Sequence, residues 1–206
     1  MSLSLKIISI GILLFYGLIR WGLNSYWILI SPYWGYAFEF AFVLSAFYLL
    51  RVKSLGRLTR RDVAPLNVAF VSGFIVHVFA KQQGIQVPFD MSGAETAFLL
   101  LILAPLLEEL VFRGALQTAL VNLLPVKGGV VVLSGALFAL SHGIAITYVP
   151  EPYYDFVYYQ TFYTFALGMF CARAKETSGG LLSAINVHFG FNLGFYIASV
   201  FGFNYL

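Results

Sequence analysis

The sequence has little charge and almost no cysteine. Only 10% of its 206 residues are Asp, Glu, Lys or Arg, and 60% are hydrophobic, whereas about 25% of the residues in a typical soluble domain are charged. A chain of this composition cannot cover a folded surface with polar side chains, which excludes an ordinary soluble enzyme, a disordered chain and a nucleic-acid-binding protein. The single cysteine, Cys171, excludes an intrachain disulfide. The alternating polar and apolar pattern of a membrane β-barrel is also missing.

Long apolar stretches take the place of the missing charge. A transmembrane helix needs about 20 mostly apolar residues. Candidate spans lie at 7–19, 33–50, 63–80, 96–120, 130–149, 158–172 and 181–203. The sequence therefore predicts an all-α fold: a polytopic membrane helix bundle of about seven transmembrane helices, forming a single integral membrane domain over residues 1–206.

The distribution of positive charge predicts the orientation of this bundle. If the spans alternate, nine basic residues fall on one side and only Arg20 and Lys81 fall on the other. The nine are Lys6, Arg51, Lys53, Arg57, Arg60, Arg61, Lys127, Arg173 and Lys175. Loops rich in Lys and Arg stay in the cytoplasm. We therefore expect an integral membrane protein with a cytoplasmic N-terminus and an outside C-terminus.

Ionisable side chains inside the apolar stretches are the strongest functional signal. Each costs about 2.5–3.5 kcal/mol at the centre of a membrane helix, so such residues are usually paired or functional. Three of the stretches carry the ionisable or amide side chains that we take as candidates, and these residues are Glu108, Glu109, Arg113, His142, His188 and Asn192. These six residues are the candidates for chemistry.

Helical spacing separates the two glutamates. Glu109 and Arg113 are four residues apart, so they share a helix face and are expected to pair. Glu108 lies about 100° further round the helix and is expected to face a neighbouring helix. His188 and Asn192 are also four residues apart and share a face.

Other residues in the spans have a structural interpretation. Gly190 and Gly194 form a small-residue pair, which predicts close approach of a neighbouring helix. His77 is expected to be structural or pore-lining. Glu39 lies alone within the second stretch, and its position offers no functional argument.

Three short motifs, taken together, resemble those of a known family. Glu108-Glu109-Leu-Val-Phe-Arg113 resembles EExxxR, Phe138 to His142 resembles FxxxH, and His188 to Asn192 resembles HxxxN. Their order and spacing resemble the CPBP family of intramembrane proteases, which comprises the type 2 CAAX prenyl proteases and bacteriocin-processing relatives, also called Abi proteins. The resemblance covers about 96–203. We therefore expect variable N-terminal helices over 1–90, followed by a catalytic core over 96–203.

The resemblance implies a role for each motif residue. Glu108 and His142 would activate the attacking water, and His188 and Asn192 would stabilise the oxyanion. Glu109 and Arg113 would have a supporting role, holding the helix and the local charge in place.

A metal-free mechanism is favoured, although zinc remains an alternative. Glu108, His142 and His188 could ligate zinc and leave one position open. Against this, the chain has no HExxH pair, and Asn192 suits an oxyanion site better than a zinc shell. No cofactor is therefore expected.

The expected function is that of an intramembrane endopeptidase, which hydrolyses a peptide bond of a membrane-associated protein or peptide. Its partners would be that substrate and the lipid bilayer, and not nucleic acid; the sequence leaves the oligomeric state and the substrate open. One alternative is a non-catalytic membrane protein of the same family, such as a bacteriocin immunity factor. Another is a small transporter or proton relay, which we disfavour because the polar groups gather at one depth instead of along a path.

Overall fold

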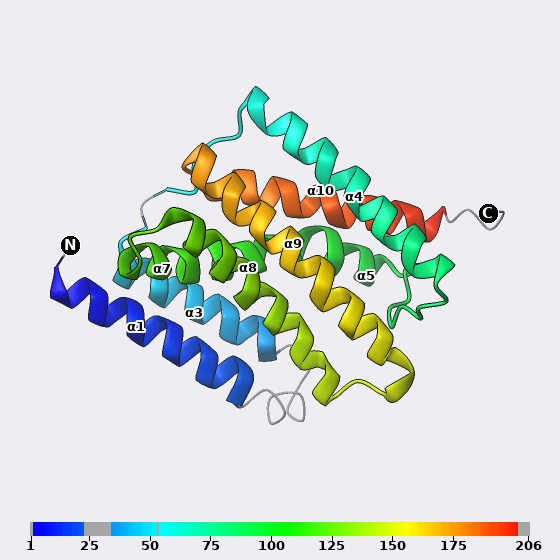
Figure 1. Cartoon of the computed structure of the whole chain (residues 1–206), viewed down its shortest axis with the longest axis horizontal. Coiled ribbons are helices and arrows are strands. Elements are labelled where there is room, and N and C mark those ends of the chain that lie inside the picture. Colours follow the sequence, from blue (N-terminus) through cyan, green and yellow to red (C-terminus); the bar gives the residue numbers. More distant parts are fainter. Residues whose placement is uncertain (1, 23–33, 53, 202–206) are drawn as a thin grey trace.

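The computed structural model describes residues 2–22, 34–52 and 54–201, and its regular elements there are all helical (Figure 1). This confirms the all-α class. Lys53, counted above among the basic residues, and the predicted end of the last span at 203 lie outside the described residues. The elements before the first motif are α1 (Leu3–Gly17), η1 (Leu18–Gly22), α3 (Trp34–Leu50), η2 (Arg60–Asp62) and α4 (Val63–Gln82). Those after it are α8 (Lys127–Gly143), η5 (Ile144–Thr147), η6 (Glu151–Tyr153), α9 (Tyr154–Ser178) and α10 (Leu181–Val200).

The first motif lies in a helical rod that changes its winding along its length. The rod runs without a break through α5 (Ala94–Phe98), η3 (Leu99–Leu103), α6 (Ala104–Glu109), η4 (Leu110–Gln117) and α7 (Thr118–Leu123). Both η3 and η4 are π-helical. A π-helical turn is rare and is frequently found at functional sites. Here η4 begins directly after the two glutamates.

The helices coincide with the predicted apolar stretches. Within the described residues, each of the seven stretches corresponds to one helical rod. Four rods are long and apolar enough to cross a membrane: Leu3–Gly22, Arg60–Gln82, Lys127–Thr147 and Leu181–Val200. The chain is thus an integral membrane protein, whereas the count of about seven spans remains a prediction. The largest difference from the predicted bounds is α9, because the polar residues flanking stretch 158–172 extend the helix without interrupting it.

The motif rod lies at the centre of the bundle. α10 packs along α4 and α9 and also contacts α6, and α8 packs along α9. α1 and α3 cover the other side of the rod, at η4 and α7 (Figure 1). As a result, all residues of η4 from Val111 to Gln117 are buried.

Glycine sets the distance between α4 and α10. A Cβ on Gly194 would collide with the Phe70 carbonyl of α4, and a Cβ on Gly73 would collide with the Phe191 carbonyl of α10. Gly190 likewise has the Leu66 carbonyl 2.9 Å from the place of its missing Cβ. The close approach predicted from Gly190 and Gly194 is confirmed, and α4 contributes its own glycine to it.

We expect Gly194→Ala to destabilise the protein by about 1–3 kcal/mol, the usual effect of overpacking. The new methyl group would clash with backbone atoms of α4, which cannot rotate away as a side chain can, so the two helices must move apart. Thermal unfolding in detergent measures the change. Gly11→Ala is the matched control, because nothing lies within 4 Å of that position, and alanine in a helix is otherwise more stable than glycine by about 1 kcal/mol. Equal melting temperatures for the two variants would contradict the packing argument.

Candidate active site

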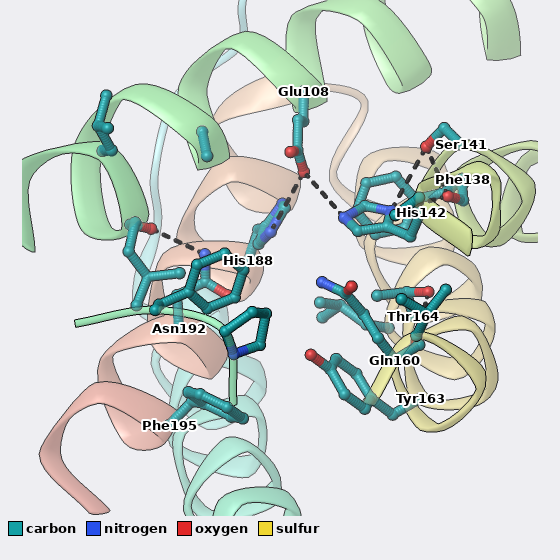
Figure 2. Close-up of a pocket in the computed structure, with 18 of the residues that line it drawn as sticks. Glu108, Phe138, Ser141, His142, Gln160, Tyr163, Thr164, His188, Asn192 and Phe195 are labelled. Atoms are coloured by element: carbon teal, nitrogen blue, oxygen red, sulfur yellow. Dashed lines mark hydrogen bonds and ion pairs between the residues drawn. The ribbon is translucent and has the colours of Figure 1, made fainter. Parts of the chain in front are cut away.

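A cavity of about 550 Å³ lies among the helices that carry the motifs. Ligand sites in proteins commonly measure about 300–1,000 Å³. Four of the six candidate residues line this cavity, and they come from three different helical rods: Glu108, His142, His188 and Asn192 (Figure 2). Residues 84 positions apart in the chain are thus brought into one cavity, as the motifs predict.

Glu108 faces two histidines at once. Its Oε2 atom lies 3.7 Å from His188 Nε2 and 4.0 Å from His142 Nε2 (Figure 2). The expectation that Glu108 faces neighbouring helices and not Arg113 is confirmed. The two gaps are slightly longer than direct hydrogen bonds. The carboxylate and the two rings therefore surround a point at which a small group could bind.

His142 is oriented by the last turn of its own helix. Its Nδ1 atom lies 3.0 Å from the Phe138 carbonyl oxygen and 3.4 Å from Ser141 Oγ. A carbonyl can only accept, so Nδ1 carries the proton and donates it. The Nε2 atom of the neutral ring then presents its lone pair toward Glu108. Phe138, the first residue of the FxxxH motif, thus fixes the tautomer through its backbone.

Glu109 orients the second histidine. Its Oε1 atom accepts hydrogen bonds of 2.8 Å from Arg113 Nη1 and of 2.8 Å from His188 Nδ1. The predicted pairing with Arg113 is confirmed, whereas the bond to His188 was not predicted. Both Glu109 and Arg113 are 0% exposed, and Arg113 also donates to the Gly168 carbonyl over 2.8 Å. Because Nδ1 of His188 donates to Glu109, its Nε2 is the atom that faces Glu108.

Asn192 lies one helical turn beyond His188 on the same wall of the cavity (Figure 2). Its Nδ2 atom donates to the Leu100 carbonyl over 2.8 Å. Leu100 belongs to η3. In a π-helix the backbone hydrogen bonds join residues five apart, so the carbonyls do not bond to the N–H group four residues further along, as they do in an α-helix. A side-chain amide has two N–H donors, so this bond fixes the amide and leaves the second donor for a ligand.

The N-terminal helices contribute charged residues to the cavity that the motifs do not indicate. Arg20 of η1 and Glu39 of α3 both line it, with Arg20 Nε 3.9 Å from Glu39 Oε1. Tyr16 donates to the same Glu39 oxygen over 3.4 Å. The one feature of the sequence that could have indicated this contribution is Glu39, an ionisable residue within an apolar stretch. His77 is buried with its ring edge-on to Phe195, 4.8 Å between centroids, which agrees with a structural role.

Polar side chains of α9 complete the wall opposite α10. Gln160 and Thr164, four residues apart, share one helix face with Tyr163 beside them (Figure 2). No motif marks them, and a search for ionisable groups passes over them because none is charged at neutral pH.

The gaps between Glu108 and the two histidines fit a bridging water molecule. A water with hydrogen bonds of about 2.8 Å to two groups can bridge a gap of 4 Å. Adjacent ligands of tetrahedral zinc lie about 3.3 Å apart, only slightly closer than Glu108 is to His188 and His142. Both histidines also donate their other ring N–H to an acceptor, as zinc-binding histidines do.

A second group of metal-binding atoms lies deeper. Among the described residues, Glu109, Cys171 and His188 bring ligand atoms within 4.8 Å of one another. Arg113 already holds Glu109, and a guanidinium so close disfavours a cation. This group is better explained as buried support for His188.

Comparison with known proteins agrees with the motifs. A family model described as type II CAAX prenyl endopeptidase, Rce1-like, matches residues 92–194. That region makes up half of the chain and contains all three motifs. Neither the curated proteins nor the solved structures gave a match. On the strength of the family match, the chain belongs to the Rce1-like family of type II CAAX prenyl endopeptidases.

Proposed function

We propose that this protein is an intramembrane endopeptidase, in which Glu108 and His142 activate a water molecule for attack on a peptide bond. The observation that supports it best is the position of the Glu108 carboxylate, which faces Nε2 of both His142 and His188 inside a cavity of an integral membrane protein. The family match independently supports a peptidase. A base, a second proton acceptor and the Asn192 amide line the same cavity, and these are the groups that hydrolysis requires.

In the proposed mechanism, the water binds between Glu108 and His142 and gives up a proton as its oxygen attacks the peptide carbonyl carbon. The tetrahedral oxyanion is stabilised by His188 and by the second N–H of Asn192. Donation from His188 Nε2 requires the imidazolium form, and its Nδ1–H is then held by Glu109. When the C–N bond breaks, the proton taken from the water passes to the leaving amine.

A zinc-dependent variant of this proposal uses the same residues. Glu108, His142 and His188 would hold the ion, which when bound supplies a Lewis acid and acidifies a coordinated water. We favour the metal-free mechanism because the chain has no HExxH pair and because Asn192 offers an amide donor beside His188. Either form uses Glu109 and Arg113 as support.

The number of spans, the membrane and the orientation of the chain are also proposals. We infer about seven transmembrane spans in a bacterial inner membrane, with the N-terminus in the cytoplasm and the C-terminus outside. The distribution of Lys and Arg supports this orientation. The substrate would be a membrane-associated protein or peptide.

We expect His142→Ala to lower peptide hydrolysis by about 10²- to 10⁴-fold, the usual contribution of a positioned acid or base. The assay uses purified protein in liposomes with a library of membrane peptides, each with and without chelator. His77→Ala is the matched control, because it removes a buried histidine that does not line the cavity. Activity that resists chelation supports the metal-free form, and activity lost to chelation and restored by zinc supports the other. Equal activity of the two alanine variants would overturn the role of His142.

A further inference from the structure

We propose that Lys175 is a positioning residue for the hydrolytic reaction, because its ammonium group holds the far end of the π-helical segment η4. That segment carries Arg113, which together with Glu109 orients His188. The inference rests on the proposed function, since it assigns Lys175 a part in the same reaction. In the sequence, Lys175 belongs to none of the three motifs and is only one of the basic residues that predict the orientation of the bundle.

The Lys175 side chain extends from α9 to the junction between η4 and α7. Its Nζ atom donates to the Arg113 carbonyl and, over 2.8 Å, to Thr118 Oγ1. The Thr118 hydroxyl in turn donates to the same carbonyl over 3.4 Å. The ammonium, the hydroxyl and the carbonyl thus form a closed triangle of hydrogen bonds. Lys175 is half-buried, and a lysine is rarely buried unless its ammonium group has such partners.

The winding of η4 explains why side chains bond to this carbonyl. In a π-helix each carbonyl accepts from the N–H group five residues further along, which for Arg113 is the N–H of Thr118. The Thr118 N–H instead donates to the Ala115 carbonyl, at the residue where α7 begins. The Arg113 carbonyl therefore accepts from Lys175 and from the Thr118 hydroxyl in place of that N–H.

Lys175 is the last of a row of ties between α9 and η4. Arg113 Nη2 donates to the Gly168 carbonyl over 2.8 Å, and Gln117 Nε2 donates to the Ala172 carbonyl over 3.2 Å. Positions 168, 172 and 175 are four and three residues apart, so they share one face of α9. In the first two ties η4 donates through a side chain, whereas Lys175 donates to the backbone of η4. It is therefore the tie that acts directly on the path of the main chain.

Arg113 connects Lys175 to the reacting groups. Its carbonyl is held by Lys175, and its Nη1 atom donates to Glu109 Oε1 over 2.8 Å. The same Oε1 atom accepts from His188 Nδ1 over 2.8 Å. His188 Nε2 lies 3.7 Å from Glu108 Oε2. A continuous series of contacts thus runs from Lys175 to the place where the attacking water is proposed to bind.

Loss of the ammonium group should affect the rate and not the binding of substrate. Without it, the Arg113 carbonyl keeps only the Thr118 hydroxyl of the triangle, and the junction is free to change its winding. A displacement of about 1 Å can lower turnover by about 10²-fold, even when the substitution is far from the chemistry. Lys175 does not line the cavity, so it has no contact with the substrate to lose.

Steady-state cleavage in liposomes by Lys175→Met and Lys175→Arg tests the proposal. Methionine keeps an unbranched chain but has no donor, and we expect kcat to fall by about 10²-fold with KM unchanged. Arginine restores N–H donors at the same place, so Lys175→Arg should recover most of the rate. Arg173→Met is the matched control, because that cation lies on the same helix but pairs with Glu176 at the surface. A wild-type rate for Lys175→Met, or a rate for Lys175→Arg no better than that of Lys175→Met, would overturn the proposal.

Proton NMR in detergent tests the same link without hydrolysis. An imidazole N–H that donates to a carboxylate gives a resonance far downfield, and the His188→Gln variant identifies the signal that belongs to His188. We expect Lys175→Met to shift or remove this resonance, and Lys175→Arg and Arg173→Met to leave it in place. An unchanged resonance in Lys175→Met would contradict the connection through Arg113.

Thr118→Val serves as a second variant if Lys175→Met does not fold. It removes the hydroxyl from the triangle and leaves the charge of Lys175 in place, so we expect a smaller change of the same resonance and a smaller loss of kcat. No change in either measurement would overturn the proposal. If the His188 resonance moves as expected while every hydrolysis assay fails, the proposed function alone is rejected and the link between Lys175 and His188 stands.

Discussion

Glu108→Gln is expected to abolish peptide hydrolysis while the protein stays folded, with a loss of about 10²- to 10⁴-fold. The amide keeps the size and much of the hydrogen bonding of the carboxylate, but it cannot take a proton from water. The Glu108 carboxylate faces both cavity histidines, whereas the neighbouring Glu109 is bonded to Arg113. The measurement is single-turnover cleavage in liposomes, with thermal unfolding as the check on folding.

Glu176→Gln is the matched control for this experiment. Glu176 pairs with the exposed Arg173 on α9 and does not line the cavity, so we expect unchanged activity. If Glu108→Gln cleaves as fast as the wild-type protein, another group must activate the water. If hydrolysis is never observed but Glu108→Gln still confers a wild-type cellular phenotype, a non-catalytic role such as immunity gains support.

Arg113→Met is expected to give the largest loss of stability, about 3–5 kcal/mol. The substitution leaves the Glu109 carboxylate fully buried and without the guanidinium that pairs with it, while the hydrogen bond with His188 remains. It also removes the donor to the Gly168 carbonyl, which holds η4 against α9. Thermal or denaturant unfolding in detergent measures the change.

A double variant separates the cost of the lone charge from the loss of packing. Glu109→Gln combined with Arg113→Met removes both charges, and replacing a buried ion pair by neutral groups is often nearly neutral. We expect the double variant to be more stable than Arg113→Met but still impaired in hydrolysis, since His188 loses its charged acceptor. Arg173→Met is the control, because that exposed pair contributes about 0–1 kcal/mol. A double variant no more stable than Arg113→Met would mean that packing, not charge, dominates.

The sequence predicts the parts of this structure that depend on local geometry. Two glutamates one residue apart must point about 100° apart on a helix, so the pairing of Glu109 with Arg113 followed from spacing alone. The apolar stretches locate the helices, because a membrane helix needs a continuous apolar length. The glycines of α10 predicted close packing for the same local reason.

The parts that the sequence does not predict depend on how helices cross. Nothing in the order of residues indicates that Glu109 holds His188, because the distance between α6 and α10 is fixed by contacts elsewhere. Glu39 and Arg20 line the cavity, although they lie in N-terminal helices that carry no motif. Helical periodicity also assumes 3.6 residues per turn throughout, and η3 and η4 depart from it.

The winding of η4 makes the length of that segment matter as much as its composition. Eight residues, Leu110–Gln117, follow the wider π-helical path between the glutamates and α7. Each residue gained or lost beyond what this wider winding takes up would turn its two halves against each other by about 100°. Glu108 would then leave the histidines even though every motif letter was still present. Insertions and deletions here are therefore a separate class of damaging mutation.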